Sequence, residues 1–387
     1  MKAILSYPLY RRSKATNEEE ATGYLAAGSV IEVINVTPGK LLDGISIWFY
    51  SDDGFYYWGG GIEFSDNAVF ADWNGLDEEM QKALLDSLVA DDLFWFQKKV
   101  IGYVGCGWGY KNNQVNRGLA LSIFVVKKDA SSNFGSTVLY KGYNVPVDVK
   151  ETGILRHHAY SSPPLIQLRP DIDDLVGGSI CDEGDKNSYG TRSICLFSQD
   201  GKRYLMTCFH VLLNPYKEQG KYPNTNSEPV FAEAPSKARK PGIKGRFNLK
   251  VIEGKYDGCF DYAIVELPPG SEYLNKVNQR TFLDYYRISE LNSLIKKTVS
   301  LVGATSNYQT GIVNDVRGSI TVNANHTCSN VVVAERLSTG GDSGAPVIDD
   351  SGKLVGIVVS GDDSNMTLIL PVSYFFSNSN YSLTKPN

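Results

Sequence analysis

The chain has 387 residues, with 38 Lys and Arg against 43 Asp and Glu, and hydrophobic residues make up 42% of it. This composition excludes an intrinsically disordered chain, which combines low hydrophobicity with high net charge, and it excludes a polybasic nucleic-acid-binding protein. The length predicts two or three domains.

The N-terminus, the apolar segments and the cysteines bear on the location of the protein. Residues 1–8 are too short and too interrupted by Pro8 for a signal peptide, and Arg11 and Arg12 follow directly. No apolar run approaches the ~18 residues of a membrane-spanning helix. The six cysteines include no Cys-x-x-Cys pair, which disfavours a zinc site. We therefore expect a cytoplasmic protein with mostly free thiols and without a membrane partner, metal or cofactor.

Residues 1–65 are predicted to form a small β-barrel. Short apolar stretches, such as 29–34 and 45–50, alternate with turn sequences containing Gly, Pro and Asp. The order of strands and the aromatic segment 48–58 resemble bacterial Src-homology-three-like domains, which bind peptides or cell-wall glycans. The resemblance implies a peptide or protein partner for this barrel. The alternative is a barrel that only packs against its neighbour.

Residues 66–164 are predicted to form a connecting subdomain of one helix and several strands. Apolar residues recur at helical spacing within 74–100, and Asn74 or Asp77 can cap that helix. Strands are predicted to follow up to about residue 150.

Residues 165–387 alternate short strands and turns without a long helix, which predicts a mainly β double barrel. Within it, the stretch 237–255 carries several basic residues and one acidic one. We predict a solvated loop and hairpin there, and no nucleic-acid partner.

The sequence Gly-Gly-Asp-Ser-Gly-Ala-Pro-Val at 340–347 is the strongest chemical signal. A nucleophilic serine needs a tight turn that presents its hydroxyl, with backbone N–H groups directed at one point. The glycines around Ser343 allow such a turn and leave room for a substrate carbonyl. A strand, a turn and a returning strand follow, as far as Ser360 and Gly361.

A serine hydroxyl needs a base, and the base needs a carboxylate that orients it. His210 ends an apolar strand, whereas His157 and His158 precede the barrel and are predicted to be surface residues. Asp261 begins another apolar strand; its rival, Asp257, lies in a turn sequence.

These segments resemble the chymotrypsin-like and trypsin-like serine proteases. Thr-Cys-Phe-His at 207–210 is similar to their Thr-Ala-Ala-His, the strand from Asp261 to their Asp-x-Ala-x-x-x-Leu, and 340–347 to their serine loop. Residues 100–215 also resemble the narrow-leaf type of plant and bacterial trypsin-like peptidases, through Val-Pro-x-Asp-Val at 145–149. The family order of His, Asp and Ser is kept here.

The resemblance implies a serine endopeptidase acting on a protein substrate, with His210, Asp261 and Ser343 as catalytic residues. The N–H groups of Gly341 and Ser343 would form the oxyanion hole. Substrate would bind along Ser360 and Gly361, and Leu337 would favour an apolar or small side chain before the cleaved bond.

Two further interpretations stay open at this point. The chain could be a catalytically latent or inactive protease-like protein that serves as a scaffold. Residues 171–178 also resemble an activation peptide of digestive zymogens, but Asp174 replaces the basic residue that precedes the cut. We therefore predict that the intact protein needs no cleavage before Leu175.

Overall fold

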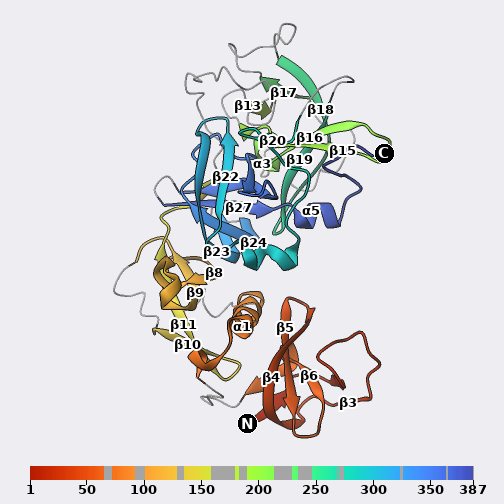
Figure 1. Ribbon diagram of the computed structural model, residues 1–387, viewed down its shortest axis with the longest axis vertical. Helices are drawn as coiled ribbons and strands as arrows, with labels where there is room; N and C mark the ends of the chain where they lie inside the picture. The colour runs from red at the N-terminus through yellow and green to blue at the C-terminus, as the bar shows by residue number, and fades with distance from the viewer. Residues whose placement is uncertain are drawn as a thin grey trace. The chain divides into compact units, whose positions relative to one another are not determined.

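The structure is a computed structural model that describes residues 1–64, 72–91, 101–128, 135–157, 179–182, 190–212, 229–233, 246–267, 269, 274–322, 326–362 and 365–386. The chain divides into two compact units, Met1–Glu151 and Thr152–Asn387. Figure 1 shows the elements of each unit. The finer division at residues 65 and 165 stays a prediction.

The first unit begins with a five-stranded sheet. Its order is β6-β5-β4-β1-β7, with β1 Lys2–Leu5, β4 Val30–Leu42, β5 Ile45–Ser51, β6 Tyr56–Trp58 and β7 Ile62–Phe64. A short hairpin, β2 Leu9–Arg11 with β3 Gly23–Leu25, and a turn of 3₁₀ helix, η1 Gly59–Gly61, accompany it. Trp48 and Phe49 of β5 are buried in its core. Its likeness to Src-homology-three domains stays a prediction.

The rest of the first unit contains the predicted helix, α1 Glu78–Ala90. The side chain of Asp77 caps it by accepting from the N–H of Met80 at 2.7 Å. A second set of strands has the order β10-β11-β9-β8 and includes a parallel β9–β11 pair. Its elements are β8 Tyr103–Tyr110, β9 Leu119–Val125, β10 Thr137–Tyr140 and β11 Tyr143–Glu151, with 3₁₀ turns η2 Trp73–Gly75, η3 Lys111–Asn113 and η4 Val115–Arg117.

The second unit contains a first barrel built from residues 179–266. Its strands follow the order β14-β13-β17-β18-β19-β16-β15. Only Arg192 and Ser193 separate β14 from β15, the two ends of this path, so the sheet returns on itself. The strands are β13 Ser179–Asp182, β14 Gly190–Thr191, β15 Ile194–Phe197, β16 Arg203–Thr207, β17 Pro229–Glu233, β18 Arg246–Asp257 and β19 Phe260–Glu266.

The second barrel is closed by hydrogen bonding. Its strand order is β23-β22-β25-β26-β27-β24, and β23 also pairs with β24. The two barrels confirm the predicted mainly β double-barrel fold. The strands are β22 Thr298–Gly303, β23 Asn307–Val322, β24 His326–Glu335, β25 Pro346–Asp349, β26 Leu354–Gly361 and β27 Met366–Pro371.

Short elements complete the second unit. They are β12 Arg156–His157, helix α3 Phe209–Leu212, strands β20 Lys276–Val277 and β21 Arg280–Thr281, 3₁₀ helix η5 Ile288–Leu294 and helix α5 Ser373–Ser377. Among the described residues, no helix is long and apolar enough to cross a membrane. The described cysteine side chains are free thiols: Cys106, Cys195, Cys208, Cys259 and Cys328.

Candidate active site

Three elements of the second unit bring the predicted catalytic side chains together. His210 lies in α3, shortly after the end of β16, and Asp261 is the second residue of β19. Because β16 and β19 are hydrogen-bonded neighbours, with Thr207 opposite Ala263, the ends of these strands carry both residues to the same place. Ser343 comes from the loop that precedes β25.

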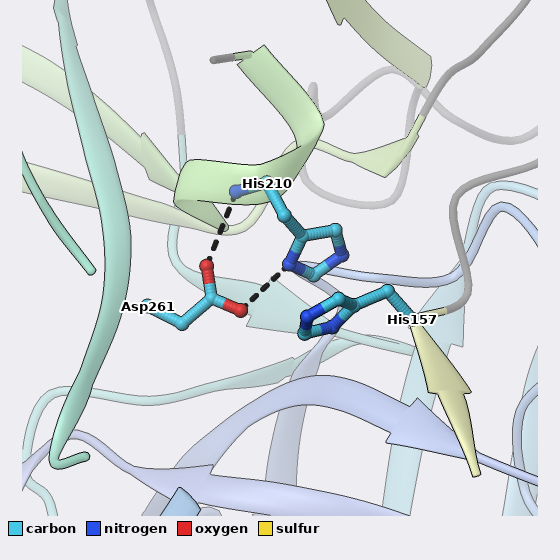
Figure 2. Close-up of side chains that lie close together, drawn as sticks. All are labelled: His157, His210 and Asp261. Atoms are coloured by element: carbon cyan, nitrogen blue, oxygen red, sulfur yellow. Dashed lines mark hydrogen bonds and ion pairs between the residues drawn. The ribbon is translucent and has the colours of Figure 1, made fainter. Parts of the chain in front are cut away.

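The imidazole of His210 lies between the carboxylate and the hydroxyl. Its Nδ1 is 2.6 Å from Oδ2 of Asp261, and its Nε2 is 2.8 Å from Oγ of Ser343. Asp261 also accepts from the backbone N–H of His210 through Oδ1, at 3.2 Å. Figure 2 shows these two contacts of Asp261. A carboxylate held at two points fixes the ring so that Nε2 faces Ser343.

The electrostatics keep Asp261 ionised. The residue is completely buried, and burial alone would raise the pKa of its carboxyl group. The charge and hydrogen bond of His210 outweigh burial and hold this pKa at about 2. A charged Asp261 can accept a hydrogen bond from Nδ1–H and stabilise a protonated imidazole, so the nitrogen free to accept a proton is Nε2.

The loop around Ser343 has the conformation that a nucleophile requires. Gly344 has φ +92°, and a Cβ added there would lie 2.4 Å from the carbonyl oxygen of Thr191. The N–H of Gly344 donates to the carbonyl of Val358 at 2.8 Å, which anchors the loop to β26. Within the part of the chain that the structure describes, the N–H groups of Gly341 and Ser343 donate to no other residue. Two such donors beside a serine hydroxyl can receive an oxyanion.

A comparison with protein families agrees with this geometry. The family model described as "Trypsin-like peptidase domain" matches residues 193–357, a range that includes His210, Asp261 and Ser343. The chain carries a trypsin-like peptidase domain. No curated protein matches the sequence.

Several solved proteases resemble the chain. Nocardiopsis protease is 15% identical, with 54% of this chain and 98% of that chain covered and a TM-score of 0.40. Thermobifida fusca protease A is 14% identical, with 55% and 98% covered and a TM-score of 0.40. Cellulomonas bogoriensis chymotrypsin is 17% identical, with 55% and 100% covered and a TM-score of 0.37.

Asp342, the residue before Ser343, is buried, and both of its carboxylate oxygens accept hydrogen bonds. Its Oδ1 accepts from the N–H groups of Thr305 and Ser306 at 2.9 and 3.1 Å, and its Oδ2 accepts from Thr339 at 2.9 Å. Burial raises the pKa of this carboxyl group, and these hydrogen bonds oppose the shift. Backbone amides of the chain thus hold Asp342. Leu175 lies outside the described residues, so activation without a cut there stays a prediction.

The predicted substrate-binding residues lie in the same domain. Leu337 is buried and packs on β23, where a Cβ added at Gly311 would lie 2.6 Å from its Cδ2. Ser360 and Gly361 end β26, and they pair with the chain's own strand β12 instead of standing open.

His157 corrects the sequence prediction, which treated it as a surface residue. Its ring stacks on that of His210, with centroids 3.9 Å apart and planes at 22° (Figure 2). Nδ1 is 3.0 Å from the carbonyl oxygen of Val359, and Nε2 is 2.9 Å from the hydroxyl of Tyr256. Burial, and then the charge of His210, lower the pKa of His157 to about 3. His158 lies outside the described residues.

Metal binding is an alternative use of this cluster. One possible ligand atom from each of His157, His210 and Asp261 lies within 4.8 Å of the other two. The geometry favours proton transfer over metal binding. Both ring nitrogens of His210 already contact Asp261 and Ser343. The lone pairs of imidazole lie in the ring plane, so two stacked rings do not direct them at one ion.

Proposed function

We propose that the peptidase domain is a serine endopeptidase that cuts a specific protein substrate by limited proteolysis. The observation that carries this proposal is the imidazole of His210 hydrogen-bonded between Asp261 and Ser343 at 2.6 and 2.8 Å. That arrangement supplies a nucleophile, a base and an orienting carboxylate in one contact chain.

In the first half-reaction, Oγ of Ser343 attacks the carbonyl carbon of the scissile peptide bond, and its proton passes to Nε2 of His210. The carbonyl oxygen becomes an oxyanion that accepts from the N–H groups of Gly341 and Ser343, worth roughly 3 kcal/mol per donor in known cases. The C–N bond then breaks. His210 returns its proton to the leaving amine, and an ester on Ser343 remains.

In the second half-reaction, a water molecule attacks the ester and gives its proton to His210. The acyl–oxygen bond breaks, Ser343 recovers its proton from Nε2, and the new carboxylic acid leaves. Asp261 stabilises the imidazolium in both halves without taking the proton. We propose that Leu337 favours a small or apolar side chain before the cleaved bond.

The test is covalent labelling with a fluorophosphonate probe, read by intact and peptide mass spectrometry. The adduct is expected on Ser343 of the wild type, and it is expected to be lost in Ser343→Ala and His210→Ala. Folding of each variant is checked by far-UV circular dichroism. If neither the folded wild type nor a folded variant in which strand β12 is released, such as His157→Ala, forms an adduct, the proposal is wrong.

The second candidate function is that of a latent or inactive protease-like scaffold. One observation favours it: Ser343 has no solvent-exposed surface. A nucleophile in this state cannot receive a protein substrate until part of the chain moves.

A further inference from the structure

One side of strand β26 is open to an added strand near the nucleophile. β27 pairs with β26 along its end, with Leu368 opposite Ser360 and Thr367 opposite Gly361. On the other side, β25 pairs with β26 only as far as Ile357. The last residues of β26 therefore have one free edge, and β12 occupies it, with Arg156 opposite Gly361 and His157 opposite Ser360.

β12 runs toward the nucleophile. Val358 of β26 accepts from the N–H of Gly344 at 2.8 Å and donates to the carbonyl of Ala345 at 3.0 Å, so this part of β26 lies beside Ser343. β26 leads away from the nucleophile from there to Gly361. Because β12 is antiparallel to it, β12 approaches the nucleophile from Arg156 to His157. A substrate added to this edge would have the same polarity, with its scissile bond following the paired residues.

Side-chain contacts hold β12 on this edge. The hydroxyl of Ser360 donates to the carbonyl of Arg156 at 2.6 Å. The carbonyl of Val359 can only accept, so Nδ1 of His157 carries the proton and donates to it, and Nε2 accepts from the hydroxyl of Tyr256. The ring covers the face of His210. Together these groups form a subsite for a neutral imidazole: the Val359 carbonyl accepts from it, the Tyr256 hydroxyl donates to it, and the His210 ring stacks on it.

The reacting groups are covered in this state. Ser343 and Asp261 have no exposed surface, and the side chain of His210 is 2% exposed. A protein substrate needs the hydroxyl of Ser343 and the Ser360–Gly361 edge at the same time, and β12 holds that edge.

We propose that β12 is a built-in occupant of the substrate-binding edge, so that the resting protein is inhibited by its own chain, and that the edge takes extended peptides with a histidine where His157 stands. This inference rests on the proposed function for its meaning in catalysis, but the occupancy itself is tested by binding. Release of β12 opens the edge to a substrate strand of the same chemistry.

The binding test uses the full chain with Ser343→Ala, which prevents turnover. The probe is fluorescein-labelled Ile-Leu-Arg-His-amide, the sequence of residues 154–157, followed by polarisation. We expect His157→Ala or Arg156→Pro to tighten binding at least about tenfold, since the first removes a stacked ring with two hydrogen bonds and the second breaks strand pairing. Ile154→Ala is the matched control, because Ile154 is 62% exposed in the same segment, and it should leave affinity unchanged.

The outcomes separate the inference from the proposed function. Equal affinity in all variants, or no binding to any of them, overturns the inference. A probe with alanine in place of histidine should bind at least about fivefold more weakly to the opened variants, and equal binding overturns the histidine preference. Fluorophosphonate labelling is then measured with Ser343 intact. If the opened variants bind the peptide more tightly but none of them is labelled, the proposed function alone is wrong. If the wild type is labelled as fast as His157→Ala, the inference alone is wrong.

Discussion

Acidification should loosen the contact between His157 and His210. The pKa of His157 is lowered to about 3 in the folded protein, against about 6.5 for a free histidine. A histidine with a lowered pKa is neutral when folded and takes up a proton when released. The contribution of His157 to the free energy of unfolding is therefore complete above pH 6.5. Below pH 6.5 this contribution falls by about 1.4 kcal/mol for each pH unit, until about pH 3.

Lowering the pH from 7 to 5 should therefore cost about 2 kcal/mol of stability, which is roughly a 30-fold change in the folding equilibrium constant. Among the described residues, the groups that act on His157 include His210, Asp261, His326 and the hydroxyl of Tyr256. Asp261 has a pKa of about 2, so it keeps its charge through this range. The variant His157→Phe keeps a ring on His210 but cannot titrate, and it retains every other group.

The measurement is the free energy of unfolding in urea at pH 7 and pH 5, for wild type and His157→Phe. All five tryptophans lie within residues 1–151, so their fluorescence follows the first unit, whereas far-UV circular dichroism follows both. From pH 7 to pH 5, the free energy of unfolding of the second unit should fall by about 2 kcal/mol more in the wild type than in the variant. Parallel losses in the two proteins would refute the reasoning.

Three other changes test the site and the fold. Asp261→Asn should leave the domain folded but slow fluorophosphonate labelling of the β12-opened protein about 10³- to 10⁴-fold, because the His210 tautomer is no longer fixed; a loss under tenfold contradicts this. Asp342→Ala leaves the N–H groups of Thr305, Ser306 and Thr339 without their acceptor, so we expect the thermal unfolding temperature to fall by several degrees and labelling to be lost. An unchanged melting curve would count against this expectation. Asp77→Ala removes the cap of α1 and should cost about 1 kcal/mol in the tryptophan-monitored transition, with the exposed Glu79→Ala as the control.

The sequence could predict the candidate site because each of its three residues stands in a recognisable local pattern. Ser343 stands among glycines that a tight turn requires, and His210 and Asp261 each adjoin an apolar strand of one barrel. The rival carboxylate, Asp257, makes different contacts, since its side chain accepts from the N–H of Cys259 and its carbonyl contacts His326. The double barrel followed from the regular alternation of strands and turns.

The occupant of the substrate edge could not be predicted in the same way. β12 has two described residues, which is too short for any hydrophobic period, and it pairs with residues about 200 positions later in the chain. Nothing near His157 in sequence identifies its partners, since Tyr256 and Val359 come from β18 and β26. The stack on His210 is therefore visible only once the fold has brought these strands together.

The open side of β26 also matters for handling the protein. An unpaired strand edge is a template on which a second chain can add a strand, and the adjoining residues Val358 and Val359 favour β structure. In the intact chain, β12 pairs with that edge and covers it. A recombinant fragment that begins at residue 165 would lack β12 and leave the edge exposed, so it should self-associate or aggregate. A fragment that begins at Thr152 retains β12 and should aggregate less than the shorter fragment.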